Sequence, residues 1–338
     1  MNERQSTRSL ATITAIGAYV PEKVLTNDDL AGMVETNDEW IVQRTGIRER
    51  RISAPDQYTS DLCFAAIENM MARYAVTVHD ADLILVATHT PDFPFPSVAC
   101  QIQARFDIAS AGAVDLNATC AGFSYALHMA NGLVTAGLHR KVLVVAADQM
   151  SRITDYTDRS TCILFGDGAG AALVENGAAS PVFLGAHLGS NGAGGIHVYR
   201  TGFRSEWQGK PLQDTKMAVQ NGREVYKWAV QTVPQGMRAL AAETGVPLES
   251  VDWFVPHSAN LRMVESICEK SGYPVDKTLV SMVRYGNTSA ASIPLALSDA
   301  ASEGKLKPGQ TVLLYGFGGG LTHAGLLVRW PLREETLQ

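Results

Sequence analysis

The chain has 338 residues and a formal net charge of −6, with 46% hydrophobic but only 18% charged residues. A chain of this length is expected to hold about two domains with ample material for a large core. Its acidic balance argues against general nucleic-acid binding, which depends on neutralising phosphates. The sequence has no run of about 18 uninterrupted apolar residues, so no membrane span is expected, and its polar N-terminus does not resemble a secretory signal.

The number and spacing of the cysteines indicate the redox state of the compartment in which the protein resides. The sequence has five of them without a C-x-x-C pair, which predicts neither a disulfide framework nor a metal site. Cys63, Cys162 and Cys268 lie in apolar runs and are predicted to be core residues, whereas the position of Cys100 is left open. This usage is typical of the reducing cytoplasm, where we expect the protein to reside.

The first half of the chain alternates strands with helices. Strands are expected at residues 11–19, 83–88 and 141–147, and helices at residues 27–33, 59–74 and 98–106. Such alternation indicates an α/β fold with parallel strand pairing.

Three further segments are expected between and within the halves. The glycine-rich residues 162–174 predict a strand, a turn and a second strand. A dinucleotide-binding loop is disfavoured there, because no amphipathic helix follows the glycines. Residues 175–214 are expected to connect the halves, and residues 219–244 to form one long helix or a helix pair interrupted at Pro234.

The second half repeats the order of the first. The apolar strand at residues 82–86 matches residues 252–256, and the turn and helix at Cys120 match those at Asn287. The sequence therefore predicts two duplicated halves, residues 1–178 and 179–338, which place Cys120 and Asn287 at equivalent positions.

Cys120 is a candidate nucleophile. It stands in a tight turn between a short apolar strand and a helix in which apolar residues recur at helical spacing. A thiol at a helix N-terminus lies near unpaired backbone N–H groups and the positive end of the helix dipole, which favours the thiolate. Ala121 and Gly122 would leave the sulfur accessible. The alternative is a buried structural cysteine.

Three polar residues of the second half are candidate partners of Cys120. His257 and Asn260 follow the strand at residues 253–255, and Asn287 opens the helix equivalent to that of Cys120. Sites in α/β proteins form at strand ends, so these side chains are expected to converge. Alternatively, His257 is a half-exposed histidine with ordinary partners and Asn287 is a turn residue.

An aromatic residue lies among arginines near the N-terminus. Trp40 precedes Arg44, Arg48, Arg50 and Arg51, a combination that suits a nucleotide through stacking of the base and charge on the phosphates. The alternative is a solvated basic face with one half-buried tryptophan.

These motifs together resemble the β-ketoacyl-acyl carrier protein synthase III family of the thiolase-like superfamily. The matching segments, in family order over nearly the whole chain, are residues 36–41, 44–47, 117–123, 165–170, 255–260, 286–292 and 316–320. The resemblance implies a layered αβαβα fold from two βαβ-rich halves. It also implies a decarboxylative condensation of a short acyl-CoA with malonyl-acyl carrier protein, which starts fatty-acid synthesis. Both compounds would be substrates, so no cofactor is implied.

The resemblance also implies catalytic roles. Cys120 would attack the acyl-CoA thioester and carry the acyl group, while its backbone N–H and that of Gly319 form the oxyanion hole. His257 and Asn287 would donate hydrogen bonds to the malonyl thioester oxygen as carbon dioxide leaves, and His257 must then be neutral with Nε2 protonated.

Binding residues follow from the same resemblance. Coenzyme A would lie against Trp40, Arg44, Arg152, Gly222 and Asn260, with Trp40 and Arg152 on the two faces of the adenine. Phe95 and Phe317 would line the acyl pocket, Phe95 by reaching the partner subunit of a homodimer. The acidic carrier protein would dock on Ser258, Ala259, Asn260, Leu261, Arg262, Arg223, Lys227 and Lys270, whose positive charges raise the association rate.

Two departures from the family pattern leave the primer open. Many members carry Gln at Ser258 and Trp at His323, and these changes could alter carrier docking and the pocket floor. Small residues around Cys120 would admit acetyl, and overall likeness favours branched primers as well.

Four rival interpretations stay open from the sequence. One is a synthase III homologue of secondary metabolism with another acyl donor or partner. The second is a thiolase, which would need a second catalytic cysteine in place of the Asn287 motif. The third is a Cys-His-Asn hydrolase, which would release free acid. The last is a non-catalytic acyl-binding protein.

Overall fold

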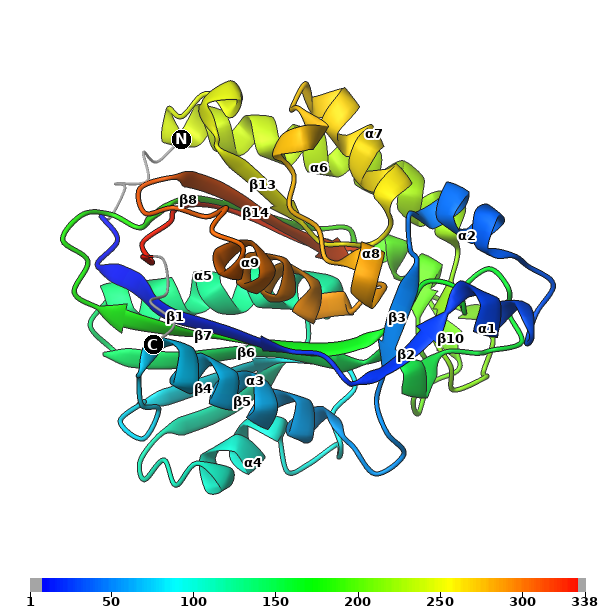
Figure 1. The fold of residues 1–338 in the computed structure, drawn as a ribbon, viewed down its shortest axis with the longest axis horizontal. Helices are drawn as coiled ribbons and strands as arrows, with labels where there is room; N and C mark the ends of the chain where they lie inside the picture. The colour runs from blue at the N-terminus through cyan, green and yellow to red at the C-terminus, as the bar shows by residue number, and fades with distance from the viewer. Residues whose placement is uncertain (1–7, 334–338) are drawn as a thin grey trace.

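Two mixed sheets form the frame of the fold (Figure 1). The structure is a computed structural model and describes residues 8–333. The first sheet has the order β1 (Ala11–Tyr19), β7 (Asp167–Asn176), β6 (Lys141–Gln149), β4 (Leu83–Ala87) and β5 (Gly112–Leu116). The second has the order β13 (Trp253–Pro256), β14 (Thr311–Gly318), β15 (Thr322–Arg329) and β8 (Phe183–Ser190). The expected boundary near residue 178 falls between the last strand of one sheet and the first strand of the other.

Helices lie in three layers around these sheets. Figure 1 shows α5 (Gly122–Thr135) and α9 (Ser292–Ser302) between the sheets. The outer face of the first sheet carries α3 (Thr59–Tyr74) and α4 (Val98–Arg105), and that of the second carries α6 (Gly222–Thr244) and α7 (Leu261–Ser271). The layers are therefore αβαβα, and the thiolase-like fold class is confirmed.

The buried apolar side chains of the layers form three main clusters. Buried residues of both sheets pack with those of α5 and α9 in one central cluster, and each outer helix pair packs on its sheet in a separate cluster. The middle helices must be apolar on nearly all sides to fill that place, and α5 buries Phe123, Ala126, Leu127, Ala130 and Val134. Cys63, Cys162 and Cys268 are core residues as predicted, whereas Cys100 is exposed.

Strand pairing is only partly parallel. β4 pairs in parallel with β5 and β6, and β13 with β14, as the alternation of strands and helices predicts. β7 runs antiparallel to β6 and β1, and β15 runs antiparallel to β14 and β8. Of these antiparallel pairs, only β14 and β15 are joined by a tight connection, which requires an antiparallel pair because a parallel pair needs a crossover.

The remaining elements are short. They are α1 (Asn27–Ala31), α2 (Asp38–Thr45), α8 (Met282–Tyr285), the pair β2 (Lys23–Thr26) and β3 (Glu49–Ile52), the pair β9 (Val198–Tyr199) and β12 (Val219–Gln220), and the pair β10 (Glu206–Trp207) and β11 (Lys210–Pro211). Single 3₁₀ turns are η1 (Thr119–Ala121), η2 (Met150–Ile153), η3 (Gly192–His197), η4 (Leu248–Ser250), η5 (Val275–Lys277) and η6 (Ser289–Ala291). Within residues 8–333, no helix combines the length and hydropathy needed to cross a bilayer.

Two sequence expectations differ from the fold, and a third leaves two alternatives open. Residues 161–164 form a turn, and β7 begins inside the glycine-rich segment, so the strand-turn-strand prediction was wrong. The glycines permit close packing instead: a Cβ on Gly168 would lie 3.0 Å from Leu295 of α9, and one on Gly170 would overlap Pro294. The expected connection at residues 175–214 contains β8. Of the two alternatives for residues 219–244, the single long helix is confirmed, because α6 runs unbroken through the buried Pro234.

Candidate active site

Two 3₁₀ turns with the same geometry, one from each half, meet between the sheets. η1 leads into α5 and η6 leads into α9. Thr119 in η1 and Ser289 in η6 both take a left-handed backbone conformation, with φ of 45° and 53°. Asn117 Oδ1 accepts a hydrogen bond from the Thr119 N–H (3.2 Å), and Asn287 Oδ1 accepts one from the Ser289 N–H (2.9 Å).

This match corrects the expected correspondence between the halves. Asn287 occupies the position of Asn117, and Cys120 occupies that of Ala290, so Cys120 and Asn287 are not equivalent. They come together because the two turns pack against each other. Cys120, His257 and Asn287 line one cavity of about 120 Å³, with Asn260, Phe317 and Gly319 also in its wall.

Cys120 lies in η1, directly before the first turn of α5. Its sulfur accepts a hydrogen bond from the Ser289 hydroxyl at 3.4 Å. Burial raises the pKa of the thiol to about 12; the Ser289 hydrogen bond acts in the opposite direction and the charge of Asp148 adds to the increase. Desolvation therefore outweighs the influence of the helix N-terminus, which by itself favours the thiolate.

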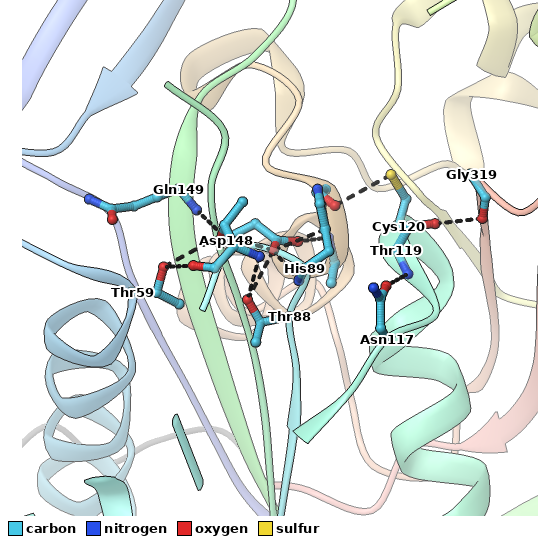
Figure 2. Close-up of polar contacts among 12 residues, drawn as sticks. Thr59, Thr88, His89, Asn117, Thr119, Cys120, Asp148, Gln149 and Gly319 are labelled. Carbon is cyan, nitrogen blue, oxygen red and sulfur yellow. Dashed lines mark hydrogen bonds and ion pairs between the residues drawn. The ribbon is translucent and has the colours of Figure 1, made fainter. Parts of the chain in front are cut away.

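Glycines bring the end of β14 against Cys120. A Cβ on Gly318 would lie 2.8 Å from the Cβ of Cys120 and 3.0 Å from its sulfur. The Thr119 hydroxyl donates to the carbonyl oxygen of Gly319 at 2.8 Å, as Figure 2 shows. The Gly319 carbonyl is thereby tied to η1, and Gly319 lines the same cavity as Cys120.

His257 is buried and neutral. Burial lowers its pKa to about 3, while a hydrogen bond with the Ser289 backbone and the charge of Asp148 act in the opposite direction. Its Nδ1 lies 2.8 Å from the Ser292 Oγ, which also accepts the backbone N–H of Ser258 at 3.2 Å. This arrangement allows the Ser292 hydroxyl to donate to Nδ1, in the tautomer whose ring proton is on Nε2. The ring meets Phe317 edge-on at 5.3 Å.

The side-chain amide nitrogen of Asn287 is available to a ligand in the cavity. The residue is buried, and its Oδ1 is occupied by the Ser289 N–H. Its backbone N–H donates to Leu164 O at 2.8 Å, and its carbonyl accepts the Gly166 N–H at 3.1 Å. These bonds fix the residue, and the NH₂ group is the part of the side chain that can donate to a ligand in the cavity.

The arginines around Trp40 are arranged differently from the expectation. The guanidinium of Arg44 lies over the Trp40 ring at 5.3 Å, and that of Arg159 at 4.9 Å. Arg152 lies instead over Tyr58 and donates to the backbone carbonyls at residues 54, 55 and 57. Arg50 is fully buried, which lowers its pKa to about 10, and donates to Ile163 O, so it belongs to the core. The sequence offered no signal for Arg159.

The expected docking residues fall into three groups by their exposure. Arg223, Lys227, Arg262 and Lys270 are exposed on α6 and α7, and Ala259, Asn260 and Leu261 are half-buried. Ser258 is completely buried and its Oγ accepts the Ser281 N–H at 3.0 Å, so its assignment to a docking surface was wrong. Asn260 caps α7 by accepting the Met263 N–H and also lines the cavity.

The other expected residues lie away from the sulfur. Gly222 is exposed at the start of α6, and Phe95 is 84% exposed outside the cavity. His323 is buried in β15, where its ring stacks on that of Tyr315 with 5.8 Å between the ring centroids. Its Nδ1 lies 3.0 Å from the Tyr315 hydroxyl, within hydrogen-bond distance. His323 is not among the described residues that line the cavity. The presence of histidine in place of the family's tryptophan therefore does not alter the cavity wall directly.

A cysteine and a pair of hydrogen-bond donors inside two related αβ halves define a condensing enzyme of the thiolase-like class. A family model described as 3-oxoacyl-[acyl-carrier-protein (ACP)] synthase III matches residues 114–192, and the corresponding C-terminal model matches residues 241–330. The chain belongs to the 3-oxoacyl-acyl carrier protein synthase III family and is an acyltransferase.

Relatives and solved structures cover nearly the whole chain. Beta-ketoacyl-acyl carrier protein synthase III 2 from Halalkalibacterium halodurans is 60% identical over 97% of this chain and 98% of its own. The protein of the same name from Bacillus subtilis is 57% identical, over 96% and 100%. The crystal structure of the synthase III from Thermus thermophilus has a TM-score of 0.90 at 44% identity, covering 94% and 98%. These relatives give no support to the rival interpretations.

Proposed function

We propose that this protein condenses a short acyl-CoA with malonyl-acyl carrier protein, giving a 3-oxoacyl-acyl carrier protein, coenzyme A and carbon dioxide, at the start of fatty-acid synthesis. The observation that carries the proposal is the single cavity lined by Cys120, His257 and Asn287 in a chain of this family. The relatives from H. halodurans and B. subtilis are named for the acyl carrier protein, which supports the carrier as a partner.

Acylation is the first half-reaction. The Cys120 sulfur attacks the thioester carbonyl, a carbon–sulfur bond forms, and the bond to the coenzyme A sulfur breaks. Because burial keeps Cys120 protonated in the empty site, its proton is released only as the substrate is attacked and leaves with the coenzyme A thiol. The backbone N–H groups of Cys120 and Gly319 hold the oxyanion.

Condensation is the second half-reaction. His257, through Nε2–H, and Asn287, through its NH₂, donate to the malonyl thioester oxygen and stabilise the enolate that forms as carbon dioxide leaves. The enolate carbon attacks the acyl-Cys120 carbonyl and expels the thiolate, which takes up a proton. A pKa of about 3 keeps His257 neutral at any physiological pH, so it acts as a hydrogen-bond donor rather than as an acid.

Substrate binding would use the surface around the cavity mouth. Trp40 and Arg44, joined by Arg159, offer a ring and two cations for the adenine and phosphates of coenzyme A. Arg152 would have to exchange its backbone carbonyl partners for the nucleotide, and Gly222 and Asn260 would complete the site. The exposed cations Arg223, Lys227, Arg262 and Lys270 would attract the acidic carrier protein.

We further propose that the protein is a homodimer of the cytoplasm. β5 is the edge strand of its sheet, and Val114 on it is 48% exposed; Phe95 (84%) and Met129 (42%) are further exposed apolar side chains. Exposed apolar side chains along an open strand edge favour pairing with another chain. An adjacent groove, lined by Leu116, Asn117, Thr119, Tyr125 and Met129, would accept Phe95 of the partner next to the Cys120 turn. All five cysteines are free, as a reducing compartment requires.

The test is the intact mass of the protein after incubation with acetyl-CoA or isobutyryl-CoA without malonyl-acyl carrier protein. We expect an acyl adduct at Cys120 that disappears in Cys120→Ala and persists in the control Cys100→Ala. The relative yields rank the two primers. Rapid release of free acid without an adduct would contradict the proposal and favour a hydrolase.

A further inference from the structure

A buried pair of titratable side chains lies behind η6, the turn that packs against the Cys120 turn η1. His89 follows β4 and Asp148 belongs to β6, and the His89 Nδ1 lies 3.1 Å from the Asp148 Oδ1. The Asp148 side chain has no exposed surface, and that of His89 is 16% exposed because it reaches the wall of the cavity that holds Cys120. Figure 2 shows both residues between Thr59 and Cys120. No role for this pair follows from the acylation and condensation steps above.

The surroundings of Asp148 hold it as an anion. Its Oδ1 accepts hydrogen bonds from the hydroxyls of Thr88 and Thr90, each at 3.1 Å, and from the His89 N–H at 2.9 Å. Its Oδ2 accepts the Ala290 N–H at 3.3 Å. Burial acts to raise the pKa of Asp148, but the charge and hydrogen bonds of His89 outweigh it, so the pKa is lowered.

The carboxylate is connected to the sulfur through η6. Ser289 precedes Ala290 and donates its hydroxyl to the Cys120 sulfur at 3.4 Å, and a Ser289 hydrogen bond is also among the causes that lower the pKa of Asp148. The hydroxyl has one hydrogen, so donating to the sulfur takes it from the carboxylate. An unneutralised anion at this place would disfavour a thiolate in two ways: it repels the charge and it competes for the Ser289 hydrogen.

In the described part of the chain, few charged groups lie near Cys120, Asp148 and His89. Cys120 faces Asp148 and the neutral His257. His89 faces Asp148 and, less closely, Arg200. Burial acts to lower the pKa of His89 and Arg200 adds to this, but Asp148 outweighs both, so the pKa of His89 is raised. Asp148 thus favours the charged form of His89, and His89 favours the charged form of Asp148.

We propose that His89 is a positioning residue: as the counter-ion of Asp148, it frees the Ser289 hydroxyl for the sulfur and so allows Cys120 to form a thiolate. The inference rests on the proposed role of Cys120 as nucleophile. The proton leaves Cys120 during acylation as described above, and His89 and Asp148 keep their protonation states throughout.

The test is the rate at which iodoacetamide alkylates Cys120 in the full chain without acyl-CoA. Rates are measured at several pH values between 6 and 7.5, and peptide mass mapping separates Cys120 from the exposed Cys100. Below the pKa of a thiol, the rate is proportional to the thiolate fraction, so a pKa raised by one unit lowers the rate about tenfold at every pH. We expect His89→Gln, which removes the charge, to lower the rate about tenfold with an unchanged slope against pH.

Two further variants separate charge from structure. The double variant His89→Gln with Asp148→Asn removes both charges and should return the rate to that of the wild type or above. His89→Lys keeps a positive charge and should lower the rate less than His89→Gln. A merely structural loss of packing at residue 89 would expose the sulfur and raise the rate.

The matched control is His139→Gln. His139 pairs with Asp82 at 3.3 Å near the start of β4, the end opposite to His89, so its loss should leave the rate unchanged. An unchanged or increased rate in His89→Gln would overturn the inference, and so would a double variant as slow as His89→Gln. Acylation of the wild type by acetyl-CoA is measured in parallel. If it fails, the proposed function fails; if it succeeds while His89→Gln alkylates normally, only this inference fails.

Discussion

The two 3₁₀ turns share a backbone and differ in chemistry. η1 and η6 have the same left-handed residue, the same asparagine hydrogen bond and the same place before a buried helix. Yet η1 carries the sulfur at Cys120, where η6 has Ala290. The asparagines differ as well, since Asn117 is exposed and Asn287 is buried in the cavity wall.

The strands behind the turns show a similar contrast. In the repeat, Gly318 at the end of β14 corresponds to Asp148 at the end of β6, and each lies against the turn of the other half. Gly318 lets a strand approach Cys120, whereas Asp148 binds the Ala290 N–H with a carboxylate. The duplication thus supplies one frame twice, and a few substitutions decide that one turn is the nucleophile and the other its support.

The largest effect on the reaction is expected from the substitution of Asn287. Asn287→Ala should still form the acyl adduct at Cys120 but should lose decarboxylation of malonyl-acyl carrier protein by about 10²–10³-fold, because a donor to the developing oxyanion is removed. Carbon dioxide release and intact mass measure the two half-reactions separately.

Asn117→Ala is the matched control for Asn287→Ala. It breaks the same backbone hydrogen bond in the other turn, which costs about 1 kcal/mol of stability by analogy with a lost cap, but it removes no donor from the cavity. Decarboxylation should stay within a few fold of the wild type. Equal losses in both variants would mean that Asn287 acts only through its turn.

A smaller effect is expected from Gly318→Ala. The new Cβ would lie 2.8 Å from the Cβ of Cys120, so η1 must shift, and a displacement of this kind lowers acylation by about tenfold to a hundredfold. The acylation rate with acetyl-CoA measures it.

Gly132→Ala in α5 is the matched control for Gly318→Ala. No atom lies within 4 Å of a Cβ at Gly132, and alanine favours a helix, so stability should increase by about 0.5–1 kcal/mol without loss of acylation. Normal acylation in Gly318→Ala would show that η1 adapts without consequence for the sulfur.

Much of the fold could be predicted from periodicity and repetition. The helix at residues 59–74 and the strand at residues 11–19 match the structure, because apolar spacing reports directly which side of an element is buried. The glycines of β7 could not be interpreted in this way, since their reason is the close approach of α9, a segment more than a hundred residues away.

The candidate site could be predicted in residue type but not in environment. Cys120, His257 and Asn287 share one cavity, as the motifs indicate. The protonation of Cys120, the burial of Ser258 and the partners of Arg152 depend on how much water the folded chain excludes, and no local pattern carries that information. His89 and Asp148 lie about 60 positions apart in the chain, and only the sheet brings them together.

The smallest effect concerns how the free energy of unfolding changes with acid, because this change involves His257 of the second half but no residue of η1. His257 has a pKa of about 3 in the folded chain and an ordinary pKa of about 6.5 unfolded, so the unfolded state binds one more proton between these values. Its contribution to stability is therefore complete above pH 6.5 and is lost progressively as the pH falls toward 3. Denaturant unfolding at pH 7, 6 and 5 should show a decline that is shallower in His257→Gln by about 1 kcal/mol per pH unit below 6.5. η1 contains no histidine, so Cys120→Ala should decline like the wild type. An equally steep decline in His257→Gln would mean that His257 is not held neutral by burial.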